Sequence, residues 1–234
     1  ELGKMTILAA MGIDSEGKKL ILGIAEGGSE NSIVVKSLLQ DLIDRGLNAD
    51  RPRLYVLDGG KALHKGVCDT FGKSALIQRC QVHKKRNVLS HLPDSVKANV
   101  SIDMTMAYRE FDYETANSKL VAIASELEYK YPKAASSLLE GLEETLTVHR
   151  LKVPGMLRET LCSTNPMESA NSACRGIIRR VSNFRDGEMA LRYAAAGFIE
   201  AERGFRRIKG YRQLPILSAM LDSLCSGTFS IKTA

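Results

Sequence analysis

Two acidic residues, Asp58 and Glu168, stand where a carboxylate could do chemistry. Glu168 lies in the segment 162–171, which has the sequence CSTNPMESAN. Asn165 suits a helix N-cap and Pro166 the first helical position, so Glu168 falls at the third, where a carboxylate can bond back to the cap. A capping role is the simpler interpretation of Glu168, and a catalytic acid is the alternative.

Asp58 follows a short apolar segment, Arg53–Leu57, that is typical of a strand. The pattern after Asp58 predicts a helix over Lys61–Phe71 and a second strand over Ala75–Gln78. This alternation favours parallel strands joined by a crossover helix. Ligand sites of α/β proteins lie at the carboxyl ends of such strands, which is the position of Asp58. The alternative is that Asp58 caps the following helix.

The net charge of +6 is concentrated in one segment. Residues 175–212 contain ten Lys or Arg against four Asp or Glu, which accounts for the whole excess. A localised excess of arginine is typical of a phosphate-binding surface, although a solvated helix face is the simpler alternative. The candidate DNA-binding residues are Arg175, Arg179, Arg180, Arg185, Arg203, Arg206 and Arg207.

The first part of the chain predicts a β-hairpin followed by a helix. The hairpin strands are Met5–Ile13 and Lys18–Ala25, and the helix covers Ser32–Arg45. Asp14 opens the Gly-containing turn between the strands, so we expect it to shape the turn and not to act as a catalytic acid.

Cys80 and His83 have the spacing of metal ligands, but no second pair follows at zinc-finger distance. We therefore expect them to begin a helix, with the basic residues 84–86 on its solvated face. The five cysteines are scattered, so reduced thiols are expected. Residues 93–160 have the composition and periodicity of helices, and a further helix is expected over Glu188–Arg206.

Several of these segments, in this order and spacing, resemble the bacterial insertion-sequence transposases of the Mutator superfamily. The resemblance covers nearly the whole chain. The segments that carry it are Leu57-Asp58-Gly59, 78–87 (QRCQVHKKRN), 163–169 (STNPMES), 184–187 (FRDG), and 205–208 (FRRI) through Leu214-Pro215.

The resemblance implies an α/β fold, an RNase H-like mixed sheet with an all-helical insertion domain. It implies that Asp58 is the second catalytic Asp and Glu168 the catalytic Glu of a DDE transposase. Both would be metal ligands, and Cys80, His83 and Asn165 would be signature residues. The cofactor would be two Mg²⁺ ions, with Mn²⁺ as a possible substitute, supporting in-line phosphoryl transfer in DNA cleavage and strand transfer.

The family's first catalytic Asp lies on a strand upstream of the hairpin, so we expect this chain to be truncated at its front and to lack the first strand of the sheet. That strand lies between the hairpin and the strand Arg53–Leu57. Its absence predicts either a gap in the sheet or direct pairing of the strands Met5–Ile13 and Arg53–Leu57.

The resemblance also implies the domain order. Residues 1–92 would form the first part of the RNase H-like catalytic domain, 93–160 the helical insertion, 161–212 the C-terminal helices of the catalytic domain, and 213–234 a C-terminal tail. The expected partners are double-stranded DNA, at the element ends and the target, and further copies of the chain. No run of about 18 apolar residues occurs, so no membrane partner and a cytoplasmic, nucleoid-associated location are expected.

Two alternatives stay open. The chain could be a catalytically inactive, truncated remnant that only binds DNA, which the missing Asp favours and the presence of Asp58 and Glu168 disfavours. It could instead be an unrelated α/β nucleotide-binding regulator in which Asp58 is a cap. The segment Gly59-Gly60-Lys61 lacks the spacing of a phosphate-binding loop, which weighs against the regulator.

Overall fold

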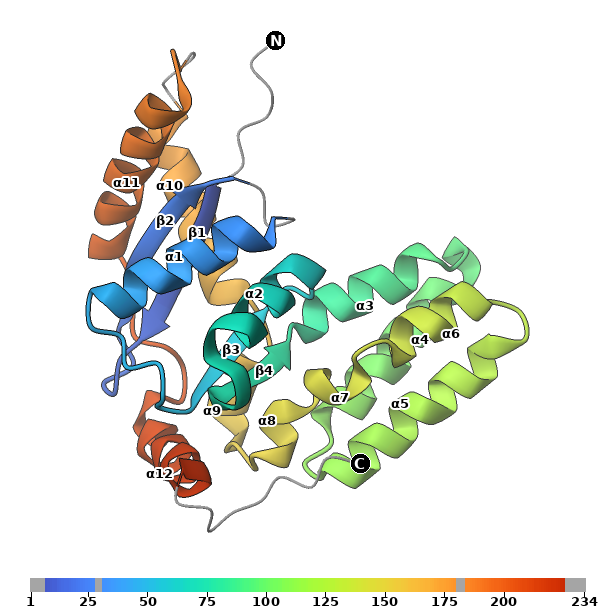
Figure 1. The fold of residues 1–234 in the computed structure, drawn as a ribbon. Helices are drawn as coiled ribbons and strands as arrows, with labels where there is room; N and C mark the ends of the chain where they lie inside the picture. The colour runs from blue at the N-terminus through green and yellow to red at the C-terminus, as the bar shows by residue number, and fades with distance from the viewer. Residues whose placement is uncertain (1–6, 28–30, 180–183, 226–234) are drawn as a thin grey trace.

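The computed structural model describes residues 7–27, 31–179 and 184–225 (Figure 1). The predicted hairpin is present as the antiparallel strands β1 (Ile7–Ile13) and β2 (Lys19–Glu26), with a bulge between Ala10 and Met11. Asp14 shapes the turn as predicted, because its Oδ1 accepts hydrogen bonds from the N–H groups of Glu16 (2.9 Å) and Lys18 (2.8 Å).

The second sheet consists of two parallel strands, as the alternating pattern predicts. Strand β3 (Arg53–Leu57) pairs with β4 (Ala75–Arg79). The connection between them is helix α2 (Lys61–Phe71) followed by a short 3₁₀ turn, η1 (Gly72–Ser74). Helix α1 (Ser32–Asp44) precedes β3.

The two sheets remain separate, since no hydrogen-bonded ladder joins β1 to β3 among the described residues. A gap is therefore found where direct pairing was the alternative. The two sheets nevertheless share one helical cover on α1 and α2, built on Val35, Leu39 and Phe71. Side chains from both sheets pack against this cover, among them Leu8, Ala10 and Leu22 of the hairpin and Tyr55, Leu57 and Ile77 of the second sheet.

Alternate residues of the hairpin face a different pair of helices. Helices α10 (Asn165–Ile178) and α11 (Gly187–Arg203) pack on it through Ala170, Cys174 and Phe198. Their partners in the hairpin are Ala9, Met11, Ile21 and Ile24. Because successive side chains of a strand point to opposite faces, the hairpin is covered by α1 on one face and by α10 and α11 on the other.

Residues 93–160 are helical, as predicted, and the part from 94 to 145 forms an arm at one side of the molecule (Figure 1). A separate hydrophobic cluster holds this arm together, with Met104, Leu120 and Leu138 fully buried. The helices of the arm are α4 (Asp94–Arg109), α5 (Tyr113–Glu128), α6 (Pro132–Leu139) and α7 (Leu142–Thr145). Helices α8 (Thr147–Arg150) and α9 (Gly155–Leu161) belong instead to a cluster that packs against β3 and β4.

The chain after α11 continues into further helix. The 3₁₀ turn η2 (Tyr211–Gln213) leads into α12 (Leu214–Cys225), and Leu217 of α12 is buried in a cluster with Val148 and Leu157. Residues 226–234, the last nine residues of the expected tail, lie outside the described residues. The fold is thus of the α/β class with mostly helical content. No helix within the described ranges is long and apolar enough to cross a membrane.

Helix α3 (Gln81–Ser90) begins where predicted, but the prediction that residues 84–86 all lie on its solvated face is wrong for Lys84. The Lys84 side chain is buried, and its ammonium donates to the carbonyls of Ser137 (2.6 Å) and Glu140 (2.5 Å). These carbonyls lie at the C-terminus of α6, where helix carbonyls lack partners and attract a cation. Burial lowers the pKa of Lys84 to about 8.

This lowered pKa predicts a specific pH dependence of stability. Between about pH 8 and pH 10.5 the unfolded chain keeps the Lys84 proton that the folded protein has lost, so the contribution of Lys84 to the free energy of unfolding rises with pH. Relative to Lys84→Met, the wild type should gain about 1–2 kcal/mol between pH 7.5 and 9.5 in urea unfolding. Lys85→Met is the control, and an equal pH slope in wild type and Lys84→Met would contradict the prediction.

Candidate active site

Asp58 lies at the carboxyl end of β3, directly beside the start of α3. Cys80 follows β4 directly, and its N–H donates to the carbonyl of Leu57, the last residue of β3 (2.7 Å). Hydrogen bonding between these two segments therefore continues up to the residue before Asp58. Asp58 Oδ1 accepts from the Gly60 N–H (2.9 Å), and Gly60 is the N-cap of α2. One oxygen of Asp58 therefore shapes the turn before α2, but the predicted capping alternative is wrong, because Gly60 is the N-cap and no described side chain caps this helix.

Cys80 is the N-cap of α3 and is fully buried. Its sulfur accepts hydrogen bonds from the backbone N–H groups of His83 (3.5 Å) and Thr164 (3.4 Å). The His83 Nδ1 lies 3.3 Å from the same sulfur. Cys80 and His83 thus begin a helix as predicted, and Cys80 also joins that helix to the segment before α10.

Helix α10 begins one residue earlier than predicted, and the predicted capping role of Asn165 is wrong. Thr164 is the N-cap, and its carbonyl accepts from the N–H groups of Met167 and Glu168 (both 2.9 Å). Asn165 is the first helical residue and is exposed. The reason lies in the contact of Thr164 with Cys80, which holds Thr164 at the helix start.

Glu168 faces α3 across the start of its own helix. Its Oε1 accepts from the Thr164 hydroxyl (3.0 Å) and lies 3.7 Å from Nδ1 of His83. Its Oε2 lies 4.0 Å from the guanidinium of Arg86. The capping-box interpretation predicts a bond from the carboxylate to the backbone N–H of the cap residue. The bond is found instead to the side chain of the cap residue, Thr164.

A backbone contact brings the starts of α3 and α10 together across 81 positions of sequence. The Gln81 N–H donates to the Cys162 carbonyl (2.9 Å), so the segment that leads into α10 lies against the start of α3. Burial raises the pKa of the Cys162 thiol to about 11, so this thiol stays protonated at neutral pH. Asp58 and Glu168 are both linked to the start of α3, Asp58 through the Leu57–Cys80 contact and Glu168 through Thr164.

No group of three or more His, Cys, Asp or Glu side chains is arranged to hold a metal ion among the residues that the structure describes. Among these described residues, no hydrogen bond or ion pair joins Asp58 to Glu168.

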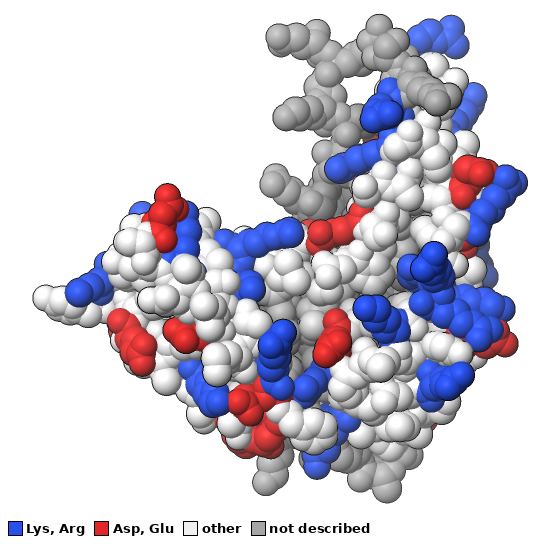
Figure 2. All heavy atoms as spheres, turned by 180° about the vertical axis from the view of Figure 1, so that it is seen from behind, with Lys and Arg blue, Asp and Glu red and all other residues white. Residues whose placement is uncertain are grey.

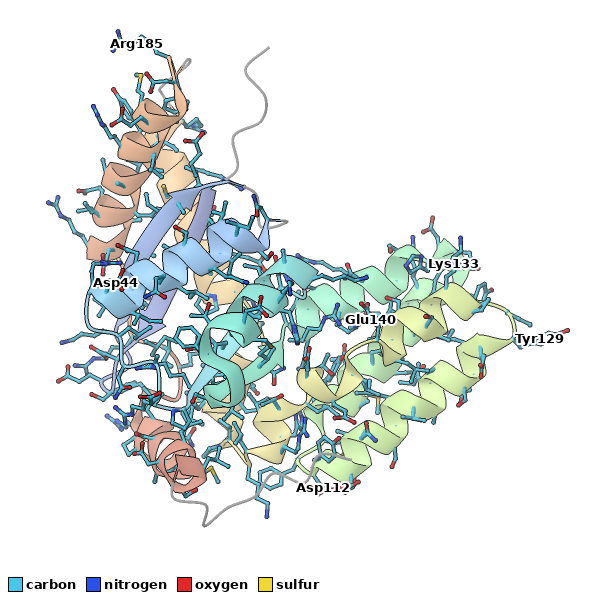
Figure 3. All side chains as sticks on the ribbon, viewed as in Figure 1. Asp44, Asp112, Tyr129, Lys133, Glu140 and Arg185 are labelled. Carbon is cyan, nitrogen blue, oxygen red and sulfur yellow. The ribbon has the colours of Figure 1, made fainter. Side chains whose placement is uncertain are left out.

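Arg79 lies between the Asp58 turn and the helical arm. Its guanidinium donates to the carbonyls of Gly59 (3.2 Å) and Glu140 (3.0 Å). Gly59 and Gly141 both have positive φ (97° and 62°), and a Cβ atom at either would collide with the guanidinium. These two glycines therefore let Arg79 connect the turn to the α6–α7 junction, where Figure 3 shows Glu140.

A cavity of about 260 Å³ lies next to this arrangement, lined by Leu57, Gly59, Ile77 and residues of α2 and the α6–α7 junction. His64 on α2 contacts Glu144 on α7 across it (2.6 Å). Sequence reasoning missed Thr164, Arg79 and this His64–Glu144 pair. The signal for Arg79 was the density of polar residues in 78–84, directly after a strand.

The arginines lie along an extended strip. Arg175 on α10 and Arg179, the C-cap of α10, are exposed, and Arg180 lies outside the described residues. Arg185 lies at the outer tip of the α10–α11 pair (Figure 3), and Arg203 at the other end of α11, which has 17 residues and is about 25 Å long. A single compact patch is therefore not formed by the described arginines.

Arg206 and Arg207 lie beyond α11, near the turn of the hairpin. Arg207 contacts Glu16 of that turn (3.4 Å) and stacks over Tyr211, as does Arg212. Lys19 lies over the ring of Phe205. Figure 2 shows Lys and Arg side chains gathered at the right of the face in view.

Comparison with known proteins gives a consistent result. The family model described as "Transposase, Mutator family" matches residues 2–207. The chain is 31% identical over 205 residues to the transposase for insertion sequence element ISRM5 of Rhizobium meliloti (strain 1021), covering 88% of this chain and 50% of that protein.

Two further relatives are similarly matched. Identity is 29% over 172 residues to the transposase for IS6120 of Mycolicibacterium smegmatis, covering 74% of this chain and 52% of that protein. It is 29% over 197 residues to the transposase for IS905 of Lactococcus lactis subsp. lactis (strain IL1403), covering 84% and 49%. The chain spans about half the length of these curated relatives. With the family match over most of its residues, the chain belongs to the Mutator family of bacterial insertion-sequence transposases.

Proposed function

We propose that this chain is part of the catalytic region of a DNA transposase that cleaves DNA strands and transfers them by metal-dependent phosphoryl transfer. The observation that carries the proposal is the placement of Glu168 against the start of α3. The N-cap of α3, Cys80, is hydrogen-bonded to Leu57, the residue before Asp58. Two carboxylates from distant segments are thus attached to the same junction, at the carboxyl end of β3. This edge is the usual position of ligand sites in α/β folds.

We also propose that the fold is RNase H-like and is completed by one more strand. Strands β1 and β3 share the cover of α1 and α2 but do not pair, so each keeps an edge of backbone N–H and C=O groups without a ladder partner among the described residues. A strand between them would give the order β2, β1, added strand, β3, β4. The relatives are about twice as long as the matched region, so they contain chain that could supply such a strand.

The residues present fit a magnesium site in chemical type. Mg²⁺ prefers oxygen ligands, and Asp58 uses one carboxylate oxygen in the turn into α2, while Glu168 uses Oε1 in its bond to Thr164. Asp58 and Glu168 would hold the ions through their other oxygens, and an acid on the added strand would be the third ligand. Bound Mg²⁺ would activate the attacking water or strand end and stabilise the leaving oxygen.

The role of Glu168 is tested by Glu168→Gln in a full-length protein that contains this chain. Loss of the charge should reduce strand cleavage about a thousandfold, or about 4 kcal/mol of barrier, because the metal site loses an anionic ligand. Cleavage of labelled DNA under single-turnover conditions measures the effect. Glu159→Gln is the matched control, since it removes the same charge from an exposed residue on α9. Near-normal cleavage by Glu168→Gln would reduce Glu168 to a helix-start residue.

The added strand is tested by comparing residues 1–234 with a longer protein that includes an upstream strand carrying an Asp. The short chain should be poorly soluble and should not cleave DNA with Mg²⁺, whereas the longer protein should be soluble and active. A version with Asn in place of that Asp should regain solubility alone, because it completes the sheet without the ligand. Metal-dependent cleavage by residues 1–234 would overturn the proposal and point to Asp14 first.

The DNA-binding role of the arginines is tested by salt dependence. We expect Arg175, Arg179 and Arg206 to contact phosphates, because they are exposed and form no ion pair among the described residues. Each contact that is removed by an Ala substitution should reduce the slope of log K against log salt by about 0.9. Arg192→Ala is the control, since Arg192 is already paired with Glu188 (2.6 Å). An unchanged slope in the triple variant would indicate an ordinary solvated surface.

A further inference from the structure

The hydroxyl of Thr164 lies among three side chains that come from two distant parts of the sequence. Its Oγ1 is 3.0 Å from Oε1 of Glu168, 3.2 Å from Nδ1 of His83 and 3.4 Å from Sγ of Cys80. An N-cap threonine ordinarily turns its oxygen back to accept from the N–H groups of the first helical turn. Thr164 makes no such capping bond, so its side chain is directed away from its own helix.

The direction of each hydrogen bond follows from the chemistry of the groups. An ionised carboxylate only accepts, so the single proton of the Thr164 hydroxyl is donated to Glu168. The lone pairs of Oγ1 are then available to accept from Nδ1–H of His83. The sulfur of Cys80 accepts the backbone N–H of Thr164, which fixes the position of the residue. This order requires that Nδ1 of His83 carries a proton.

We propose that Thr164 is a positioning residue that fixes the Glu168 carboxylate, with His83 and Cys80 holding Thr164 in place. The inference rests on the proposed role of Glu168 as a metal ligand. The hydroxyl binds Oε1, whereas Oε2 forms a long ion pair with the Arg86 guanidinium (4.0 Å). In the proposal, Oε2 would be the oxygen that holds the metal. Partners that orient a metal ligand commonly change metal affinity or activity by 10–100-fold when they are removed.

Two substitutions of Thr164 separate the hydroxyl from the shape of the side chain. Thr164→Val keeps the shape and removes the hydroxyl, whereas Thr164→Ser keeps the hydroxyl. In the full-length protein, Thr164→Val should lower kcat and Mn²⁺ affinity by about 10–100-fold without changing KM for DNA. Thr164→Ser should stay close to the wild type in both. Mn²⁺ affinity is measured by electron paramagnetic resonance and kcat by cleavage of labelled DNA.

A double-mutant cycle distinguishes failure of this inference from failure of the proposed function. If Thr164 acts through Glu168, Thr164→Val should cause no further loss in the Glu168→Gln background. A further loss there, or wild-type kcat and Mn²⁺ affinity in Thr164→Val while Glu168→Gln is impaired, would overturn the role of Thr164 alone. Near-normal cleavage by Glu168→Gln would instead overturn the proposed function.

The His83 tautomer provides a test that does not depend on activity. NMR of protein labelled with ¹⁵N-histidine should show a proton on Nδ1 of His83 in the wild type and a changed Nδ1 signal in Thr164→Val. This measurement on the wild type also covers the case in which Thr164→Val does not fold. A neutral ring with its proton on Nε2 in the wild type would contradict the proposed order of hydrogen bonds.

Discussion

The polar segment at the junction of β4 and α3 cannot be buried unless each of its side chains finds a partner. Gln78 is fully buried, and its amide binds the Thr145 carbonyl (2.8 Å) and the Val148 N–H (2.9 Å). Gln81 binds the same Thr145 carbonyl (2.8 Å). Together with Arg79, Cys80, His83 and Lys84, these residues give the β4–α3 junction contacts to β3, to the helical arm and to α10.

The junction therefore determines how the helical arm is attached. The arm has its own hydrophobic cluster, and such a cluster alone does not specify an orientation relative to the sheets. Gln78 and Gln81 attach it at Thr145 of α7, and Lys84 attaches it at the end of α6. Because buried polar groups are costly when unpaired, these bonds disfavour other arrangements of the arm.

The same junction links the arm to both candidate acids. Arg79 binds Gly59 beside Asp58 and Glu140 on the arm, while Cys80 and His83 contact the start of α10 near Glu168. A single side chain, Arg79, therefore joins the arm to the turn that carries Asp58. In contrast, the two sheets are connected through the shared apolar cover on α1 and α2, which is less directional than hydrogen bonding.

Local sequence was sufficient to locate most elements of the fold. The bounds of β3 and α2, the hairpin with its Asp14 turn, and the helical character of 93–160 all follow from periodicity and turn chemistry, which act over a few residues. Asp58 was placed at the end of a strand for the same reason. These features depend on neighbours in the chain, so no knowledge of distant contacts was needed.

Long-range packing controls the features that sequence reasoning missed. Lys84 is buried because the end of α6, more than 50 residues away, supplies carbonyl partners for its ammonium. The N-cap of α10 is Thr164 and not Asn165, because the backbone N–H of Thr164 donates to the sulfur of Cys80, 84 residues earlier. The arginines spread along the α10–α11 pair because the length of α11 separates residues that the sequence count treats as one group. For Lys84 and Thr164, the free energy of burying or pairing a group with a distant partner outweighs a local preference of less than about 2 kcal/mol.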